Sequence, residues 1–241
     1  MIIGGLEKLT LLDYPDHLAA IIFTQGCNFR CHFCYNPMLV LPRKGGDEKN
    51  KKEKGFSPLS TEDLFLFLKE RFGRLEGVVI TGGEPTMHPD LPSFIKKIKD
   101  IGYLVKLDTN GTKPEMVSQL IKDKLIDYIA MDLKAPIAKY EQTVGVKLDW
   151  DNIKKSVKII SESGLPYEFR TTVVPGLLAK EDFHKMGEFI KGASKWYLQK
   201  FKSDTDLVDS SYAKQKGYSS KEMEEFAVIG REYVHLCEVR G

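Results

Sequence analysis

The chain has 241 residues, of which 36 are Lys or Arg and 34 are Asp or Glu, giving a formal net charge of +2. This near balance gives no electrostatic reason to expect binding to nucleic acid or to a membrane. No run of eighteen apolar residues predicts a transmembrane helix, and the N-terminal residues do not resemble a signal peptide. We therefore expect a cytoplasmic protein, in which reduced, clustered cysteines indicate metal ligands or catalysts before disulfides.

Short apolar runs alternate with amphipathic segments along the chain. In chain order we predict a strand at 19–24, a helix at 60–72, a strand at 77–81, a helix at 91–100, a strand at 104–108, a helix at 114–124, a strand at 128–132, a helix at 152–163, a strand at 167–173, a helix at 181–191, a strand at 196–201 and a helix at 220–236. Strands that alternate with helices predict an α/β fold with a parallel sheet. Periodicity leaves a doubly wound sheet and part of a barrel open, but both gather their chemistry at the carboxyl ends of the strands.

The domain organisation is predicted to be simple. We treat residues 1–241 as one domain, with an N-terminal extension at 1–18 and a C-terminal helical segment at 203–241. Residues 42–58 are polar, lysine-rich and contain glycine, so we expect them to form a mobile loop.

Three of the four cysteines lie within eight residues, directly after the first predicted strand. Cys27, Cys31 and Cys34 have the spacing C-x3-C-x2-C, with the aromatic Phe33 before the last of them. A [4Fe–4S] cluster normally has four cysteine ligands, so three would leave one iron open to a small molecule, much as catalytic metal sites keep a vacant position. The alternative from the residues alone is a structural zinc site that adds His32 as the fourth ligand.

Polar residues follow the next strands at the same end. Gly82, Gly83 and Glu84 come after the second strand, where glycines allow close backbone approach and a carboxylate suits an ammonium group. Asp108 and Thr109 end the third strand, and Asp132 and Lys134 follow the fourth, so two carboxylates could share a cation. Arg170 lies on the fifth strand. The ordinary alternatives are a tight turn, helix N-caps and a surface arginine.

Taken together, these motifs resemble the radical S-adenosylmethionine (SAM) superfamily. The resemblance implies a partial (β/α)6 TIM-like barrel and a [4Fe–4S] cluster on Cys27, Cys31 and Cys34 that reductively cleaves SAM to a 5′-deoxyadenosyl radical. It also implies that nine residues bind SAM or lie beside it: Phe33, Gly82, Gly83, Glu84, Asp108, Thr109, Asp132, Lys134 and Arg170.

The segments around Asp108, Asp132 and Arg170 resemble, within that superfamily, the activating proteins of glycyl radical enzymes. This resemblance implies removal of a glycine Cα hydrogen from a partner enzyme, with a flavodoxin or a ferredoxin-type protein as electron donor. It also implies a monovalent cation near SAM, held by Asp108, Thr109, Asp132 and the carbonyl of Ala130.

The segments Gly4-Gly5-Leu6, Asp13-Tyr14-Pro15 and Leu198-Gln199-Lys200-Phe201 resemble most closely the anaerobic ribonucleoside-triphosphate reductase activating proteins. The implied partner is then an anaerobic ribonucleotide reductase. The chain departs from the pyruvate formate-lyase activator at Gln199, where that enzyme carries a substrate-side histidine. Glutamine cannot do the proton chemistry of histidine, which places the same peptide contacts in doubt.

Two other functions remain open at this point. One is a radical SAM enzyme that acts on a small molecule, such as a deazapurine precursor. The other is a non-catalytic module that binds an Fe–S cluster or zinc. The fourth cysteine, Cys237, stands apart and is expected to be a buried, inert thiol.

Overall fold

The structure is a computed structural model that describes residues 1–40 and 59–241, in two compact units. The first unit consists of Met1–Asn28, Met38–Thr109 and Glu115–Ile129, and the second of Phe29–Pro37, Asn110–Pro114 and Ala130–Gly241. The predicted mobile loop at 42–58 lies outside the described residues. The assignment of residues 1–241 to one radical SAM domain stays a prediction.

Four strands form the sheet of the first unit: β1 (Ile3–Thr10), β2 (Ala19–Thr24), β3 (Gly77–Gly82) and β4 (Leu104–Thr109). β2, β3 and β4 are parallel neighbours, with Ile22 opposite Ile80 and Ile80 opposite Leu107. Most of their residues are buried, as expected for parallel strands covered on both faces. All three were predicted from their apolar runs.

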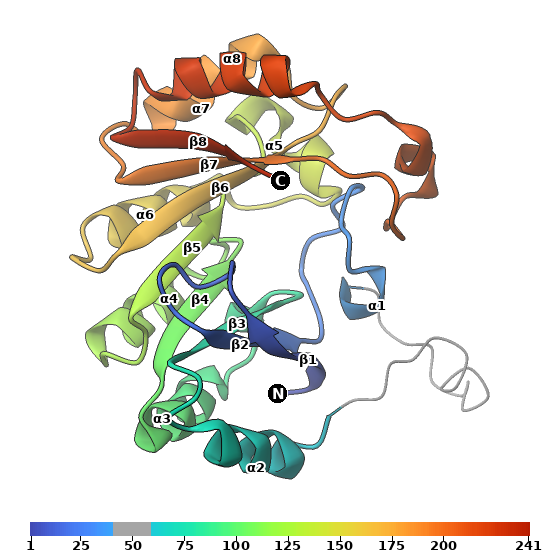
Figure 1. Cartoon of the computed structure of the whole chain (residues 1–241). Coiled ribbons are helices and arrows are strands. Elements are labelled where there is room, and N and C mark those ends of the chain that lie inside the picture. The colour runs from blue at the N-terminus through green and yellow to red at the C-terminus, as the bar shows by residue number, and fades with distance from the viewer. Residues whose placement is uncertain (41–58) are drawn as a thin grey trace. The chain divides into compact units, whose positions relative to one another are not determined.

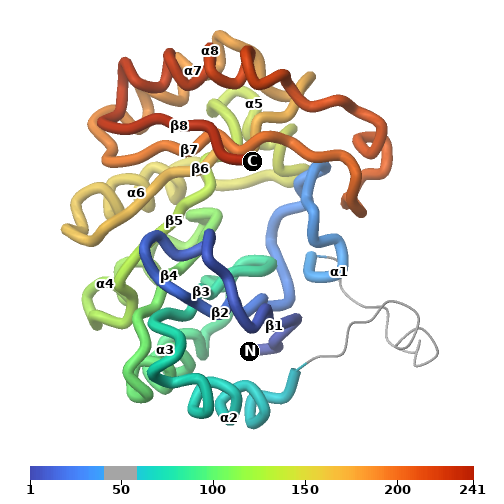
Figure 2. Tube along the Cα trace, in the orientation of Figure 1, coloured from blue at the N-terminus to red at the C-terminus, as the bar shows by residue number. Residues whose placement is uncertain are grey.

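The strand β1 was not predicted, because it lies within the N-terminal extension expected at residues 1–18. It pairs antiparallel with β2, and its register shifts twice. Figure 2 shows the two segments beside one another at the blue end of the trace. The pattern of β1 includes two adjacent glycines and a Glu-Lys pair, which weakens the strand signal. After β1, the buried ring of Tyr14 lies so close to Gly77 that a Cβ atom there would overlap it. The Asp13-Tyr14-Pro15 segment therefore packs on β3.

Two helix ends in the described part of the first unit follow the capping residues that predicted them, whereas a short helix at Pro37–Val40 was not predicted. The helices are α2 (Thr61–Arg71) and α3 (Leu91–Ile101), with α4 (Pro114–Lys122) after β4 and the short α1 (Pro37–Val40) after the cysteine loop. The Ser60 side chain accepts a hydrogen bond from the Asp63 amide at 3.0 Å, and Gly102 ends α3 with a φ of +111°. The 3-10 turn Pro85–Met87 was not predicted.

The second unit contains three parallel strands, β6 (Tyr167–Val173), β7 (Lys195–Lys200) and β8 (Leu236–Arg240). β5 (Tyr128–Asp132) begins in the first unit and ends in the second. The helices are α5 (Ile137–Val144), α6 (Trp150–Ser161), α7 (Lys180–Phe189) and α8 (Ser220–Gly230). Figure 1 shows α7 and α8 side by side over β7 and β8, with Phe183 and Phe226 stacked between the helices at 4.5 Å.

The C-terminal segment differs from its prediction as a helix over 220–236. The helix α8 ends at Gly230, and the chain turns to form β8. A Cβ on Gly230 would overlap the Cys237 sulfur atom, so this glycine lets the helix end pack directly on the new strand. The helical pattern was extended too far because a short apolar run does not distinguish a helix from a strand.

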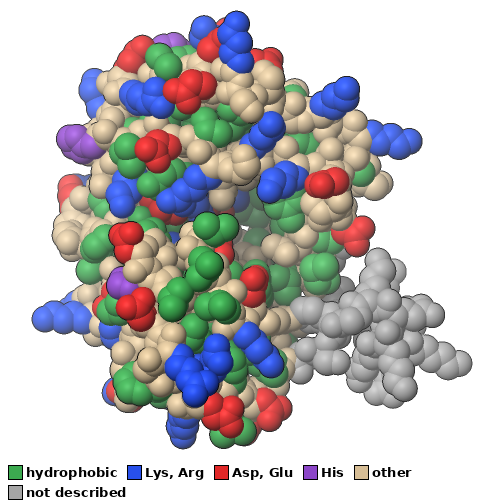
Figure 3. Space-filling view, in the orientation of Figure 1, with side chains coloured by type: hydrophobic (Ala, Val, Ile, Leu, Met, Phe, Trp, Pro, Cys, Tyr) green, Lys and Arg blue, Asp and Glu red, His purple; other side chains and the backbone are tan. Residues whose placement is uncertain are grey.

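Neither sign of charge dominates the face seen in Figure 3. Basic and acidic side chains are interspersed over the face seen in Figure 3. Among the described residues, no helix combines the length and the apolar character needed to cross a bilayer.

Candidate functional site

The cysteine loop begins in the first unit by packing on the two glycines that end β3. The amide of Gly83 donates to the Thr24 carbonyl at 2.9 Å, and the amide of Glu84 donates to the Gly26 carbonyl at 2.8 Å. A Cβ on Gly82 would overlap the Thr24 backbone, and one on Gly83 would overlap the Gly26 carbonyl. The sequence predicted close backbone approach at these glycines, and in the structure the approaching backbone is that of the cysteine loop.

Glu84 is fixed at the ends of β3 and β4. Its side chain is buried, at 1% exposure, and Oε1 accepts hydrogen bonds from the Thr86 amide at 3.1 Å and from the Thr86 hydroxyl. The Thr109 hydroxyl donates to the same oxygen at 2.8 Å. A buried carboxylate held by several donors keeps one orientation. The Glu84 and Thr109 residues singled out in the sequence are therefore in direct contact.

Asp108 forms an ion pair that the sequence motifs did not anticipate. Its Oδ1 lies 2.5 Å from the Nζ atom of Lys106, two residues earlier on β4. The Lys106 side chain is 1% exposed and that of Asp108 is 10% exposed. Alternate residues of a strand share a face, so the position of Lys106 is a signal from which the pair could have been predicted.

The remaining two motif cysteines lie in the second unit. Cys31 is buried, Cys34 is half-buried, and none of the four cysteines of the chain forms a disulfide. The Cys34 amide donates to the Cys31 carbonyl at 3.1 Å, which closes a tight turn around Phe33. Burial raises the pKa of the Cys34 thiol, against the lowering effect of the Asn36 amide and of Lys134. Positive charge at this turn would favour the thiolate form that binds metal.

Asp132, Lys134 and Arg170 form one charged cluster in the second unit. The Arg170 Nε donates to Asp132 Oδ1 at 2.9 Å, and the Lys134 Nζ donates to Asp132 Oδ2 at 2.9 Å. Burial alone would raise the pKa of Asp132, but the two cations hold it well below its usual range. The Asp132 carboxylate likewise raises the pKa of Lys134, although burial opposes this. All three side chains are therefore charged at neutral pH.

Lys134 also connects this charged cluster to the cysteine loop. Its Nζ lies 6.0 Å from the centroid of the Phe33 ring, a cation–π distance. Its backbone amide donates to the Tyr140 hydroxyl at 3.4 Å, and burial raises the pKa of that hydroxyl well above its usual value. Tyr140 lies on α5, a helix that the sequence did not predict.

A segment after β7 covers part of the cysteine loop and was also missed. The amides of Val208 and Asp209 donate to the carbonyls of Cys34 and His32 at 3.1 and 3.0 Å. The His32 Nδ1 lies 3.2 Å from Asp209 Oδ2, and the His32 ring stacks on Tyr212 with centroids 5.9 Å apart. His32, the fourth ligand of the zinc alternative, is thus engaged with this covering segment. No sequence signal joins residues so far apart.

Polar residues line β6, β7 and β8 on the face that carries Arg170. Gln199 lies opposite Arg240 in the register of β7 and β8. The Arg240 guanidinium donates to both oxygens of the buried Glu168, at 3.1 and 3.3 Å, and stacks on the Tyr197 ring. This bidentate pair fixes the guanidinium in one plane. None of these residues except Gln199 was singled out in the sequence.

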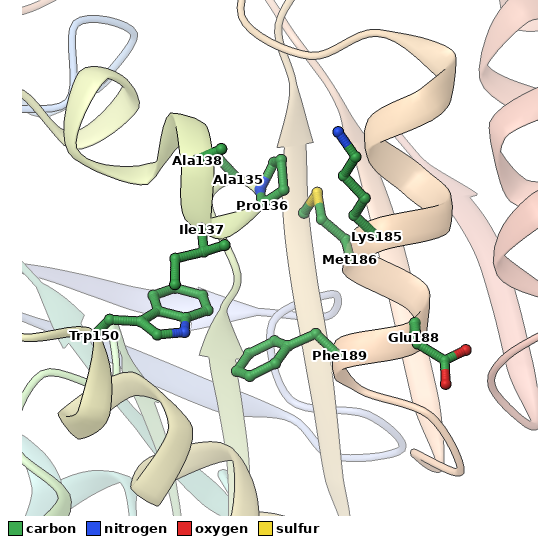
Figure 4. A pocket seen from close by; sticks show the side chains of 9 residues that line it. All are labelled: Ala135, Pro136, Ile137, Ala138, Trp150, Lys185, Met186, Glu188 and Phe189. Atoms are coloured by element: carbon green, nitrogen blue, oxygen red, sulfur yellow. The ribbon is translucent and has the colours of Figure 1, made fainter.

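A separate apolar pocket of about 340 Å³ lies elsewhere in the second unit. In Figure 4 the side chains of Trp150 and Phe189 lie next to one another among the residues that line it, with ring centroids 4.9 Å apart. Lys185 and Glu188 are its charged residues. None of the predicted site residues lines this pocket, so it is distinct from the clusters described above.

The family model named Radical SAM superfamily matches residues 21–190, which is more than half of the chain. The chain belongs to the radical SAM superfamily. The match includes the cysteine motif and every other predicted site residue. The expected superfamily and an enzymatic function are thereby confirmed, whereas the roles of the individual site residues stay predictions. The non-catalytic module, one of the alternatives that the sequence left open, is not the function that this family match supports.

Relatives of this radical SAM chain include activating enzymes. A Methanocaldococcus jannaschii protein described as a candidate glycyl-radical enzyme activating enzyme is 33% identical over 99% of this chain and 95% of its own length. The pyruvate formate-lyase-activating enzyme of Streptococcus mutans is 26% identical over 79% of this chain and 72% of its own. A GTP 3′,8-cyclase from Aliarcobacter butzleri is 28% identical over 93% of this chain and 65% of its own.

A solved structure shows the same fold. Streptococcus suis SuiB, bound to its precursor peptide SuiA, has a TM-score of 0.65 and 18% identity over 92% of this chain and 48% of the SuiB chain. This chain therefore spans about half the length of SuiB. Together with the parallel α/β arrangement of each unit, the likeness confirms the partial TIM-like barrel of the radical SAM type.

The family implies a [4Fe–4S] cluster and SAM, and the residues present fit both groups. Three cysteines lie within one short motif, and none of them is engaged in a disulfide. A buried, oriented carboxylate at Glu84 suits the amino group of SAM. The isolated Cys237 is fully buried, and burial raises its pKa to about 12, which confirms its prediction as a buried thiol outside the motif.

Proposed function

We propose that the chain activates a glycyl radical enzyme, and that Cys27, Cys31 and Cys34 hold the cluster at which SAM is cleaved. When bound, the cluster and SAM supply the 5′-deoxyadenosyl radical, which removes a Cα hydrogen from a glycine of the partner. The observation that carries the proposal is the similarity to an activating enzyme over 99% of this chain. We place the protein in the cytoplasm, with a flavodoxin or ferredoxin-type protein as its electron donor.

The residues of the first unit are proposed to orient SAM. Glu84 would accept hydrogen bonds from the SAM amino group, because hydrogen bonds from Thr86 and Thr109 already hold its carboxylate in one orientation. Gly82 and Gly83 would act indirectly, by letting the cysteine loop lie against the end of β3. This would keep the start of the cysteine loop, with Cys27, against the strand end that carries the Glu84 carboxylate, the kind of positioning that lowers the barrier to a bond-breaking step.

The residues of the second unit are proposed to bind the anionic part of SAM and the partner peptide. Lys134 and Arg170 carry two positive charges against the single negative charge of Asp132. This surplus suits a carboxylate. Phe33 would shield the cluster beside Lys134. Gln199 would donate and accept hydrogen bonds to a peptide backbone without taking part in proton transfer.

The partner proposed from the sequence resemblance is an anaerobic ribonucleotide reductase. The test uses the anaerobically reconstituted chain with dithionite, SAM and recombinant reductase, followed by electron paramagnetic resonance. A doublet signal that is absent when the radical glycine of the reductase is replaced by alanine supports the proposal. Formation of 5′-deoxyadenosine with no doublet from the reductase or from pyruvate formate-lyase contradicts it.

A second candidate function has one observation in its favour, the similarity to a GTP 3′,8-cyclase over 93% of this chain. In that case the radical would act on a nucleotide or on another small molecule, such as a deazapurine precursor. The same reconstituted chain distinguishes the two functions, because a small-molecule enzyme would form 5′-deoxyadenosine faster when incubated with GTP and no protein partner.

A further inference from the structure

We propose that the ammonium group of Lys106 supplies, from within the chain, the positive charge beside Asp108 that a bound monovalent cation supplies in the activating enzymes this sequence resembles. SAM binding by this chain would then need no added Na⁺ or K⁺. The proposal rests on the proposed function only in that Asp108 belongs to the SAM site. It makes Lys106 a positioning residue, since it acts through Asp108.

The geometry places the ammonium where a cation would have to bind. Lys106 and Asp108 lie on one face of β4, and the Nζ of Lys106 is 2.5 Å from Asp108 Oδ1. The aliphatic stem of Lys106 is buried, and its Nζ lies 5.9 Å from the centroid of the Tyr128 ring. Both the carboxylate and the aromatic face favour a positive charge at this point.

Burial makes the pair selective against a second cation. The Lys106 side chain is 1% exposed and that of Asp108 is 10% exposed, so little water screens either charge. A metal cation bound to Asp108 would be repelled by the neighbouring ammonium, and displacing that ammonium would leave it buried without its partner. The residues present therefore do not fit a metal cation at Asp108.

The second carboxylate expected to hold the cation is also neutralised within its own unit. Asp132 accepts hydrogen bonds from Arg170 on Oδ1 and from Lys134 on Oδ2, each at 2.9 Å. Each of the two carboxylates thus has a positively charged side chain in contact. This observation is independent of Lys106 and points in the same direction.

The first test needs only the wild-type chain. The affinity of the reconstituted protein for SAM is measured in NaCl, KCl and tetramethylammonium chloride at equal ionic strength, and the melting temperature of the cluster-free chain is measured in the same salts. We expect the affinity to vary by less than about twofold and the melting temperature to be the same in all three. An affinity that is about tenfold higher in Na⁺ or K⁺ than in tetramethylammonium overturns the proposal.

The second test removes the internal cation with Lys106→Met. This variant leaves Asp108 buried without its ammonium, so it should recruit a cation. Its SAM affinity should become about tenfold dependent on Na⁺ or K⁺, and its melting temperature should rise by about 3 °C in those salts. The matched control is Lys99→Met, which breaks another Lys–Asp pair of the first unit, 2.7 Å from Asp127, and should gain no dependence on either cation.

Further outcomes keep the proposal testable. A folded Lys106→Met variant that responds to Na⁺ and K⁺ no more than the control overturns it. If Lys106→Met does not fold, the double variant Lys106→Met with Asp108→Asn removes both charges, and the wild-type salt series decides the question. The melting-temperature series requires neither a cluster nor a partner, so a wild-type chain that fails to activate any glycyl radical enzyme still answers it.

Discussion

Replacing Asp132 by Asn removes the negative charge that holds Lys134 and Arg170 together. The carboxylate accepts two charge-assisted hydrogen bonds at 2.9 Å, and such bonds contribute about 1.5–3 kcal/mol each. The three side chains are 13–25% exposed, so some screening reduces this sum. Asparagine keeps one acceptor. We therefore expect the free energy of unfolding to fall by about 2–4 kcal/mol, measured by urea denaturation of the cluster-free chain at pH 7.

A double-mutant cycle separates the ion pair from other effects of the substitution. Combining Asp132→Asn with Arg170→Gln should give a coupling energy of about 1–2 kcal/mol, because the two side chains are in direct contact. The control is the exposed pair of Lys96 and Asp100, whose side chains are 66% and 60% exposed, and whose coupling should stay below about 0.5 kcal/mol. A coupling energy of Asp132 with Arg170 no larger than that of the control would show that this ion pair does not stabilise the folded chain.

Three further predictions follow from the pKa shifts and from close packing. The pKa of Asp132 in the folded chain lies below its unfolded value of about 3.9. The difference in free energy of unfolding between wild type and Asp132→Asn should therefore be complete above about pH 5 and shrink as the pH falls below 4. Urea denaturation at pH 3, 4 and 6 checks this, and a difference that grows toward pH 3 speaks against it. Gly83→Ala places a methyl group on the Gly26 carbonyl, so iron incorporation on reconstitution should fall to less than about half of wild type, and full incorporation would contradict the packing. Burial raises the pKa of Cys237 to about 12, so iodoacetamide at pH 8 should leave Cys237 of the folded, cluster-free chain unmodified while it labels the half-buried Cys27. Mass spectrometry of the peptides checks this, and rapid labelling of Cys237 would disagree.

Most of the parallel sheet was predictable from sequence because buried strands appear as short, mainly apolar runs. β2, β3 and β5 are almost entirely apolar, and β4, β6 and β7 combine apolar residues with a few polar ones. Each of the six was predicted to within one or two residues of its ends. The edge strands β1 and β8 were not predicted. Each pairs with a single neighbouring strand, and each carries several polar residues. An exposed edge weakens the hydrophobic pattern on which the prediction depends.

The positions of the candidate site residues could be predicted, but many of their contacts could not. The link from Thr109 to Glu84 was not foreseen, although both residues were named. The ion pair of Lys106 with Asp108 was not predicted, although the two residues are spaced so that they share one face of β4. The contact of His32 with Asp209 joins segments that no local pattern relates. Spacing reveals which residues carry chemistry, whereas charge neutralisation depends on the folded chain.

We propose that this chain generates a radical that takes a hydrogen atom from a glycine of a partner enzyme. The most direct measurement uses anaerobic ribonucleotide reductase produced with α-deuterated glycine, and detects 5′-deoxyadenosine by mass spectrometry after reaction with SAM and dithionite. We expect one deuterium to appear in 5′-deoxyadenosine together with the radical signal of the reductase. Abundant 5′-deoxyadenosine without deuterium, from a reductase that another activating enzyme can activate, would contradict it.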